Sequence, residues 1–194
     1  GLFICDEVQT GFGRTGKHMF GIQHYGVTPD IITMAKGIAN GAPVGATIAK
    51  AEIADSFKQP SIATYGGNPV SMAAALATLD VIEGESLVER SESVGSYLRD
   101  GLEALQQRFP GMGDVRGKGL MQAVELVKDP KTKEPDPIGA NRFLEETKKR
   151  GVLVGKGGLY GNVLRIAPPM IATRGDVDDA LKVFAEAFEV ISKS

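Results

Sequence analysis

A lysine and an aspartate, each at the end of an apolar run, are the residues of this 194-residue chain best placed to do chemistry. Lys36 ends the strand-like run 31–36 and precedes a glycine-rich turn, whereas Asp6 follows the run 2–5. If both runs are strands of one parallel sheet, their carboxyl ends meet at the same edge. The two side chains could then contact a single small cofactor.

A pyridine aldehyde is the cofactor that would use both groups. The lysine amine forms an imine with the aldehyde once it has lost its proton, which a sheltered, partly apolar setting favours. The aspartate keeps the ring nitrogen protonated because an opposite charge favours the charged form. Taken singly, each residue has a simpler interpretation, with Lys36 as a solvated lysine at a strand end and Asp6 as a helix N-cap.

Composition excludes several other classes of site. The 22 basic and 24 acidic residues nearly balance, so no surface for nucleic acid is indicated. The single cysteine, Cys5, cannot form an internal disulfide, and neither His18 nor His24 has a second ligand at metal-site spacing. No signal peptide or membrane-spanning run is apparent. We therefore expect a soluble protein of the cytoplasm or the mitochondrion, with no metal.

Glycine is unusually abundant, at 25 of 194 residues, where the usual share is about 7 %. The glycines are grouped in discrete turns rather than in repeats, which suits places where the backbone turns sharply or approaches a ligand closely. The groups are Gly11, Gly13 and Gly16; Gly37 and Gly41; Gly66 and Gly67; Gly117 and Gly119; and Gly155, Gly157 and Gly158.

Alternating strand-like and helix-like segments predict an α/β fold with a largely parallel sheet in the first part of the chain. Residues 1–84 are expected to be the carboxy-terminal part of a large sheet domain, residues 85–112 a connecting helical region, and residues 113–194 a small α+β domain. The expected strands are 2–5, 31–36, 43–49, a strand pair within 115–128 that includes 120–126, and then 152–154 and 163–166. The expected helices are 18–25, 51–57, 70–82, 86–109, 138–150 and 177–191, of which 70–82 is apolar nearly all round and should be buried.

The amino end opens directly on an apolar run, without an initiator methionine. A near-continuous apolar run such as 2–5 is typical of an interior strand of a parallel sheet, covered on both faces. We therefore expect this chain to be the carboxy-terminal piece of a longer polypeptide, inactive when isolated.

Three segments of the chain together resemble the signature of the class III pyridoxal-phosphate aminotransferases. They are Asp6 to Gly16, Pro29 to Gly37, and Thr64 to Pro69. Three motifs in the right order and spacing are far more specific than any one of them, and the resemblance extends to the last helix. It implies a transferase of fold type I that binds pyridoxal 5'-phosphate (PLP) and forms a homodimer.

The resemblance also implies a role for each matching residue. Lys36 would form the Schiff base with PLP and carry the substrate proton, and Asp6 would pair with the pyridine nitrogen. Val8 would pack on the ring, Gln9 would reach its phenolic oxygen, and Thr64 would donate to the phosphate of the neighbouring subunit. Taken without the resemblance, these last three would be a core side chain, a surface amide, and an N-cap or turn hydroxyl.

Arg165 is the last candidate site residue, because it is a charge inside the apolar run 163–166 and such a charge is costly unless it is paired. A guanidinium binds a carboxylate through two parallel hydrogen bonds, which lysine cannot reproduce. In the family that the chain resembles, this arginine binds the substrate carboxylate. The alternative is a structural salt bridge within the small domain.

These interpretations predict transamination from an amino acid, such as alanine, to a 2-oxo acid, such as glyoxylate or pyruvate. The segments 6–14 and 37–43 most resemble the alanine–glyoxylate branch of the family. Two alternatives stay open: another PLP enzyme on the same scaffold (a decarboxylase, aminomutase or epimerase), and an inactive remnant that acts only as a binding module.

Overall fold

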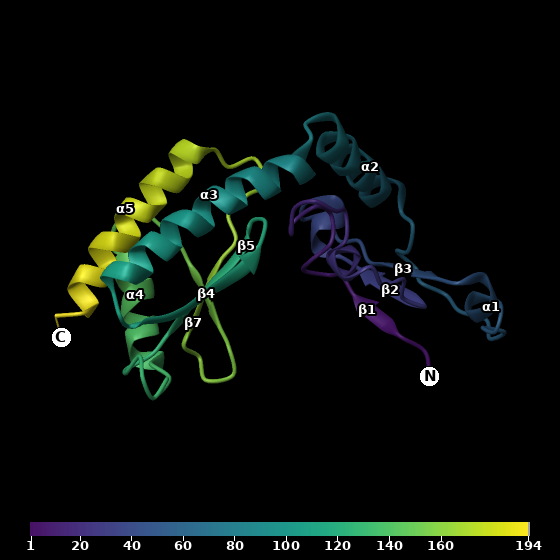
Figure 1. Ribbon diagram of the computed structural model, residues 1–194. Coiled ribbons are helices and arrows are strands. Elements are labelled where there is room, and N and C mark those ends of the chain that lie inside the picture. Colours follow the sequence, from purple (N-terminus) through teal and green to yellow (C-terminus); the bar gives the residue numbers. More distant parts are fainter. Residues whose placement is uncertain (194) are drawn as a thin grey trace. The chain divides into compact units, whose positions relative to one another are not determined.

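The computed structural model describes residues 1–193, which divide into two compact units. Unit 1 comprises Gly1–Glu89, and unit 2 begins at Arg90. The division falls near the start of one long helix, α3 (Leu87–Arg108) (Figure 1). No helix within the described residues is long and apolar enough to cross a membrane. The domain limits expected from the sequence stay a prediction.

Unit 1 is built on a three-stranded mixed sheet with the order β1-β2-β3. β1 (Ile4–Asp6) and β2 (Ile31–Met34) are parallel, and β3 (Ala46–Ala49) runs antiparallel to β2. The register pairs Asp6 with Thr33, so β1 and β2 end at the same edge of the sheet. This is the arrangement that the two apolar runs predict.

Four helical segments complete unit 1, and the longest has a well-formed start. Asn68 caps α2 by accepting a 2.9 Å hydrogen bond from the backbone amide of Ser71, and Pro69 follows at the first helical position. The segments are η1 (Gly21–Tyr25), η2 (Lys36–Ala39), α1 (Ala51–Ala54) and α2 (Pro69–Gly84).

A single carboxylate ties the three strands together at the edge opposite the ends of β1 and β2. Asp30, which precedes β2, accepts a 2.7 Å hydrogen bond from the amide of Phe3 and a 2.6 Å bond from Nζ of Lys50. Phe3 precedes β1 and Lys50 follows β3. The Lys50 ammonium and the Phe3 amide lower the pKa of Asp30, so the carboxylate is charged at neutral pH.

One expectation for unit 1 is wrong for this chain. The helix over 70–82 is not buried all round: the short η2 packs against α2, and the side chains on the rest of its surface, Val70 and Leu76 among them, are exposed. Within this chain the run 2–5 forms β1, an edge strand on which Ile4 is 57 % exposed. Its expected place inside the sheet of a longer polypeptide stays a prediction.

Unit 2 is a four-stranded antiparallel sheet, ordered β4-β5-β7-β6, with α3 and two further helices. In Figure 1 the yellow α5 lies beside the green α4, and these two helices are in contact. The bounds are β4 (Met112–Lys118), β5 (Met121–Leu126), α4 (Pro137–Lys149), β6 (Gly155–Gly157), β7 (Val163–Ile166) and α5 (Arg174–Ile191).

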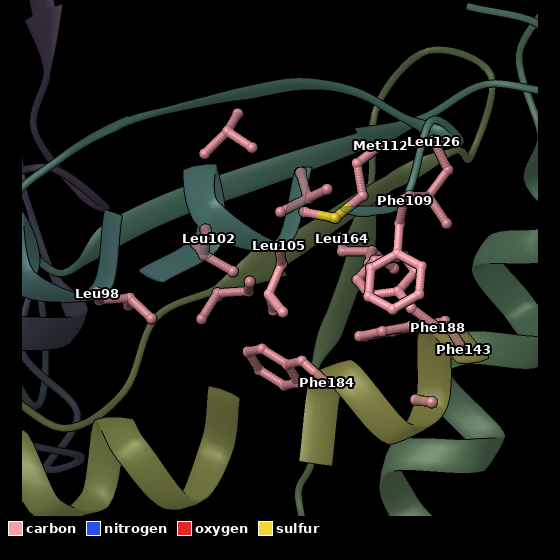
Figure 2. Packing of buried hydrophobic residues seen from close by; sticks show 14 of the residues in the cluster. Leu98, Leu102, Leu105, Phe109, Met112, Leu126, Phe143, Leu164, Phe184 and Phe188 are labelled. Carbon is pink, nitrogen blue, oxygen red and sulfur yellow. The ribbon is translucent and has the colours of Figure 1, made fainter. Parts of the chain in front are cut away.

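The core of unit 2 lies between one face of the sheet and the three helices. Along β5, buried residues at 122, 124 and 126 alternate with partly exposed ones, as a strand covered on one face requires. Figure 2 shows the aromatic centre of this core, where Phe143 lies 4.5 Å from Phe188 and 5.6 Å from Phe184 between ring centroids. We call the other side of the sheet the open face.

The predicted position of the strand at 152–154 is wrong by three residues, since β6 occupies Gly155–Gly157. Val152 and Val154 are partly buried against the core, and their apolar character reflects this packing rather than strand pairing. The ladder with β7 begins only at Gly155.

Two glycines of α3 give a matched test of how this helix packs against the rest of unit 2. A Cβ added to Gly95 would lie 2.2 Å from the carbonyl carbon and oxygen of Gly119, whereas one added to Gly101 would lie 2.2 Å from Cδ1 of Leu181. The Gly119 backbone cannot yield, but the end of the Leu181 side chain can rotate. Gly95→Ala should therefore lower the free energy of unfolding by about 1–3 kcal/mol or more.

Gly101→Ala is the control, because it gains the same helix propensity of about 1 kcal/mol and meets only a flexible group. It should lose less stability than Gly95→Ala or none. Urea denaturation of the complete protein measures both changes, and equal losses would contradict this account of the α3 packing.

Candidate active site

The candidate site lies at the edge where β1 and β2 end. Asp6 is the last residue of β1, and its partner Thr33 is three positions before Lys36, the first residue of η2. Both Asp6 and Lys36 are exposed. The structure therefore brings the ends of the two motifs to one edge of the sheet, as predicted from the apolar runs.

Asp6 is oriented by its own backbone. Its Oδ1 accepts a 3.0 Å hydrogen bond from the amide of Val8, which closes a local turn directly after the strand. The residues that follow form turns rather than a helix, so the alternative reading of Asp6 as a helix N-cap is wrong. The carboxylate is held at the sheet edge, where it can receive a cationic group.

Lys36 has a strained backbone. Its φ is +48°, in the left-handed region that a side chain with a Cβ adopts at a cost of about 1–2 kcal/mol. Strained residues of this kind persist where the surrounding structure holds them, and they cluster at active sites. The turn that holds Lys36 packs through η2 against α2.

The most heavily bonded group near the site is one that the sequence analysis missed. Glu7 follows Asp6 directly and is only 1 % exposed. Its Oε1 accepts a 2.7 Å hydrogen bond from the amide of Ile22, and its Oε2 accepts bonds from the amide of Gly21, at 2.9 Å, and from the hydroxyl of Thr10. These bonds fold the loop over 8–20 back onto the end of β1.

The ionised form of Glu7 is the one that this environment stabilises. Burial alone raises the pKa of its carboxyl, but hydrogen bonds from the side chain of Thr10 and the amides of Ile22 and Gly21 outweigh burial, so the pKa lies below its ordinary value. Gly21 has no room for a side chain, since a Cβ there would lie 2.8 Å from Cβ of Thr10. The sequence gives little indication that Glu7 is buried: it shows only an acidic residue between Asp6 and the apolar Val8.

The structure places the other predicted cofactor residues of unit 1 in turns. Val8 is partly buried and Gln9 is exposed, both in the turns that follow β1. Thr64 is exposed in a turn before α2. Because Asn68 is the N-cap of that helix, the reading of Thr64 as an N-cap is wrong, and only the turn and phosphate-binding interpretations remain.

Arg165 belongs to unit 2 and lies on the open face of its sheet. Its neighbours in β7, Leu164 and Ile166, are buried in the core, whereas Arg165 points the other way and is exposed. The expectation that it would be buried among apolar residues is wrong, because the strand alternates between its two faces. The Arg165 side chain therefore lies at the surface of this unit.

The groups at the sheet edge of unit 1 fit a cofactor with an aldehyde and a basic ring nitrogen better than they fit a metal ion. Within residues 1–193 no group of three His, Cys, Asp or Glu side chains could hold a metal. An amine and a carboxylate at the ends of adjacent parallel strands supply the two groups that such a cofactor needs.

Comparison with known proteins identifies the family. The model of "Aminotransferase class-III" matches residues 1–188. The chain belongs to the class III aminotransferases. A mitochondrial alanine–glyoxylate aminotransferase 2 homologue of Arabidopsis thaliana is 50 % identical over 92 % of this chain, and the isoleucine 2-epimerase of Lentilactobacillus buchneri is 45 % identical over 98 %. The chain spans only 37 % and 42 % of those two aminotransferase-family proteins.

A solved structure agrees with this family assignment. An amine transaminase from an uncultivated Pseudomonas species, determined in its PLP-bound form, has a TM-score of 0.90 and 40 % identity, and covers 97 % of this chain with 44 % of its own. This class III aminotransferase chain thus has the fold type I architecture expected from its motifs.

Glu7 gives a testable prediction about the candidate site. Glu7→Gln replaces one accepting oxygen by an amide nitrogen that faces buried N–H or O–H donors, so the free energy of unfolding should fall by about 1–3 kcal/mol. Because the folded pKa is lowered, the stabilisation by Glu7 is present above its ordinary pKa and is lost as the pH falls through the folded value.

Denaturant unfolding of the complete protein, from neutral to acidic pH, measures both effects. The two proteins should converge in acid, since the variant lacks the stabilisation that the wild type loses there. Glu83→Gln, which changes an exposed carboxylate on α2, should follow the wild type. A constant difference between Glu7→Gln and wild type at every pH would contradict the charged state of Glu7.

Proposed function

We propose that the complete protein containing this chain is a PLP-dependent transaminase that moves an amino group from an amino acid to a 2-oxo acid. The observation that carries this proposal is the placement of Asp6 and Lys36 at the ends of two adjacent parallel strands. Membership of the class III aminotransferases and the alanine–glyoxylate aminotransferase among its relatives support it. Alanine is the proposed donor, and glyoxylate or pyruvate the acceptor.

Each of the two groups has a separate task in this proposal. PLP, when bound, supplies an electron sink for the bonding pair released at the substrate Cα. The Lys36 amine would take the proton from the substrate Cα and pass it to the cofactor carbon that carries the aldehyde, which requires an unprotonated amine within reach of both carbons. The Asp6 carboxylate holds a proton on the pyridine nitrogen by its opposite charge.

The remaining unit 1 residues would bind and orient the cofactor. We assign Val8 to the face of the ring and Gln9 to its phenolic oxygen, because both follow Asp6 in the turns at the same sheet edge. We assign Thr64 to the phosphate of a second subunit. Its exposed position in a turn before α2 suits a donor that serves a neighbouring chain, so the proposed active form is a homodimer.

Arg165 is proposed to bind the donor carboxylate. Its exposure on the open face supports this role, because a guanidinium at the surface can receive a substrate carboxylate through two parallel hydrogen bonds.

Two finer points belong to the proposal. The protein is proposed to act in the cytoplasm or the mitochondrion. The mitochondrial alanine–glyoxylate aminotransferase 2 homologue among its relatives supports the second compartment. The second candidate reaction is racemisation at Cα, favoured by the similarity to an isoleucine epimerase. Following alanine with and without a 2-oxo acid separates the two reactions, since only transamination consumes the oxo acid and forms a new amino acid.

The identity of Lys36 as the reactive lysine gives the direct test of the function. Complete wild-type protein incubated with PLP should show a visible absorbance band that sodium borohydride abolishes, and peptide mapping should find the pyridoxyl group on Lys36. Lys36→Ala should lose the band and at least a thousandfold of the rate, roughly the contribution of a catalytic nucleophile and base. Lys58→Ala, an exposed lysine beyond α1, is the matched control and should behave as wild type.

A label on Lys50 or Lys58 would contradict the assignment of Lys36. The absence of any band from the complete wild-type protein would instead contradict the proposed function itself and favour an inactive binding module.

Asp6→Asn tests the second group separately. Asparagine keeps a side-chain oxygen for the Val8 amide, so the turn should be preserved. The lost charge lets the ring nitrogen deprotonate, and the turnover number at saturating PLP should fall about a hundredfold or more, a change of a few kcal/mol in the barrier. Stopped-flow or steady-state rates measure this, and wild-type turnover would refute the role of Asp6.

A further inference from the structure

Arg165 is flanked by very small side chains on both neighbouring strands. In the sheet of unit 2 it is directly opposite Ala123 of β5 on one side and Gly155 of β6 on the other. Directly opposite residues of antiparallel strands have their side chains on the same face. The stem of Arg165 therefore crosses a part of the open face where both neighbours leave space.

Gly157, two residues after Gly155 in β6, is the glycine closest to the aliphatic stem of Arg165. A Cβ added to Gly157 would lie 2.9 Å from Cδ and 3.6 Å from Cγ of Arg165, so the stem runs across the space that a side chain at 157 would fill. Neither Gly155 nor Gly157 has a positive φ. The backbone at 157 could accept any L-residue, and the requirement for glycine comes from Arg165.

Gly155 is less constrained, although it is the direct partner of Arg165. A Cβ added there would be 3.5 Å from Cβ and from the carbonyl oxygen of Arg165, which is an ordinary van der Waals distance. One strand thus offers two glycines on one face, of which only Gly157 is in the path of the Arg165 side chain.

We propose that Gly157 is a positioning residue for Arg165, a conclusion that rests on the proposed role of Arg165 in binding the donor carboxylate. Glycine at 157 lets the aliphatic stem lie close to β6 and so sets the direction in which the guanidinium points. Two parallel N–H···O bonds to a carboxylate tolerate little tilt. A methyl group at 157 would lift the stem and misdirect both bonds, while the fold would be preserved because only a flexible side chain has to move.

The complete protein allows a matched comparison of Gly157→Ala, Gly155→Ala and Arg165→Lys. Gly157→Ala should raise the KM for alanine about tenfold, roughly the effect of one weakened charged hydrogen bond, with a smaller change in kcat. The KM for 1-phenylethylamine, a donor without a carboxylate, should not change. Gly155→Ala should match wild type with both donors, and the melting temperatures of both glycine variants should equal or exceed the wild-type value.

Binding of propionate, measured by calorimetry, gives the same comparison without turnover. It should be weakened by Gly157→Ala and Arg165→Lys and preserved in Gly155→Ala. If Arg165→Lys weakens the binding of alanine and propionate but Gly157→Ala matches wild type, the inference about Gly157 is overturned, whereas the proposed role of Arg165 is kept. Equal loss for both donors in Gly157→Ala, or equal impairment by Gly155→Ala, would overturn it as well. Wild-type behaviour of Arg165→Lys would overturn the proposed role of Arg165, and the inference with it.

Discussion

A buried, ionised carboxylate is the constraint on which the site end of unit 1 depends. Successive side chains of an extended chain point to opposite sides. Asp6, the last residue of β1, is exposed, and Glu7, the next residue, therefore points into unit 1. Once buried, Glu7 must be fully hydrogen-bonded, and it meets this need with amides from residues that follow it by more than a dozen positions. The loop between them is therefore held close to the sheet edge.

Much of the architecture could be predicted because it is encoded in local periodicity. The stripe of Val94, Leu98, Leu102 and Leu105 in α3 repeats at helical spacing, and all four residues are buried. The ends of β1 and β2 were likewise indicated by apolar runs that stop at a charged residue. Such patterns are enough to predict a helix or strand when its apolar side chains pack on the adjacent core, because the element type alone then determines which face is buried.

Other features depend on distant partners, and there local patterns fail. Glu7 looks like a second surface acid beside Asp6, because its hydrogen-bond donors lie far along the chain. The strand over 155–157 consists of two glycines and a lysine, so it carries no apolar signal, and the valines before it drew the prediction three residues too early. The apolar surface of α2 predicted burial, but in this chain only part of it is covered.

The left-handed backbone of Lys36 carries a consequence for how this protein can change. At such a position glycine is the residue with the least conformational cost, so replacing Lys36 by glycine would relieve strain while removing the amine. Selection for thermal robustness alone would therefore favour losing this lysine, whereas the proposed catalytic role would favour keeping it. If Lys36 has the proposed role, stability and activity place opposite demands on this one dihedral angle.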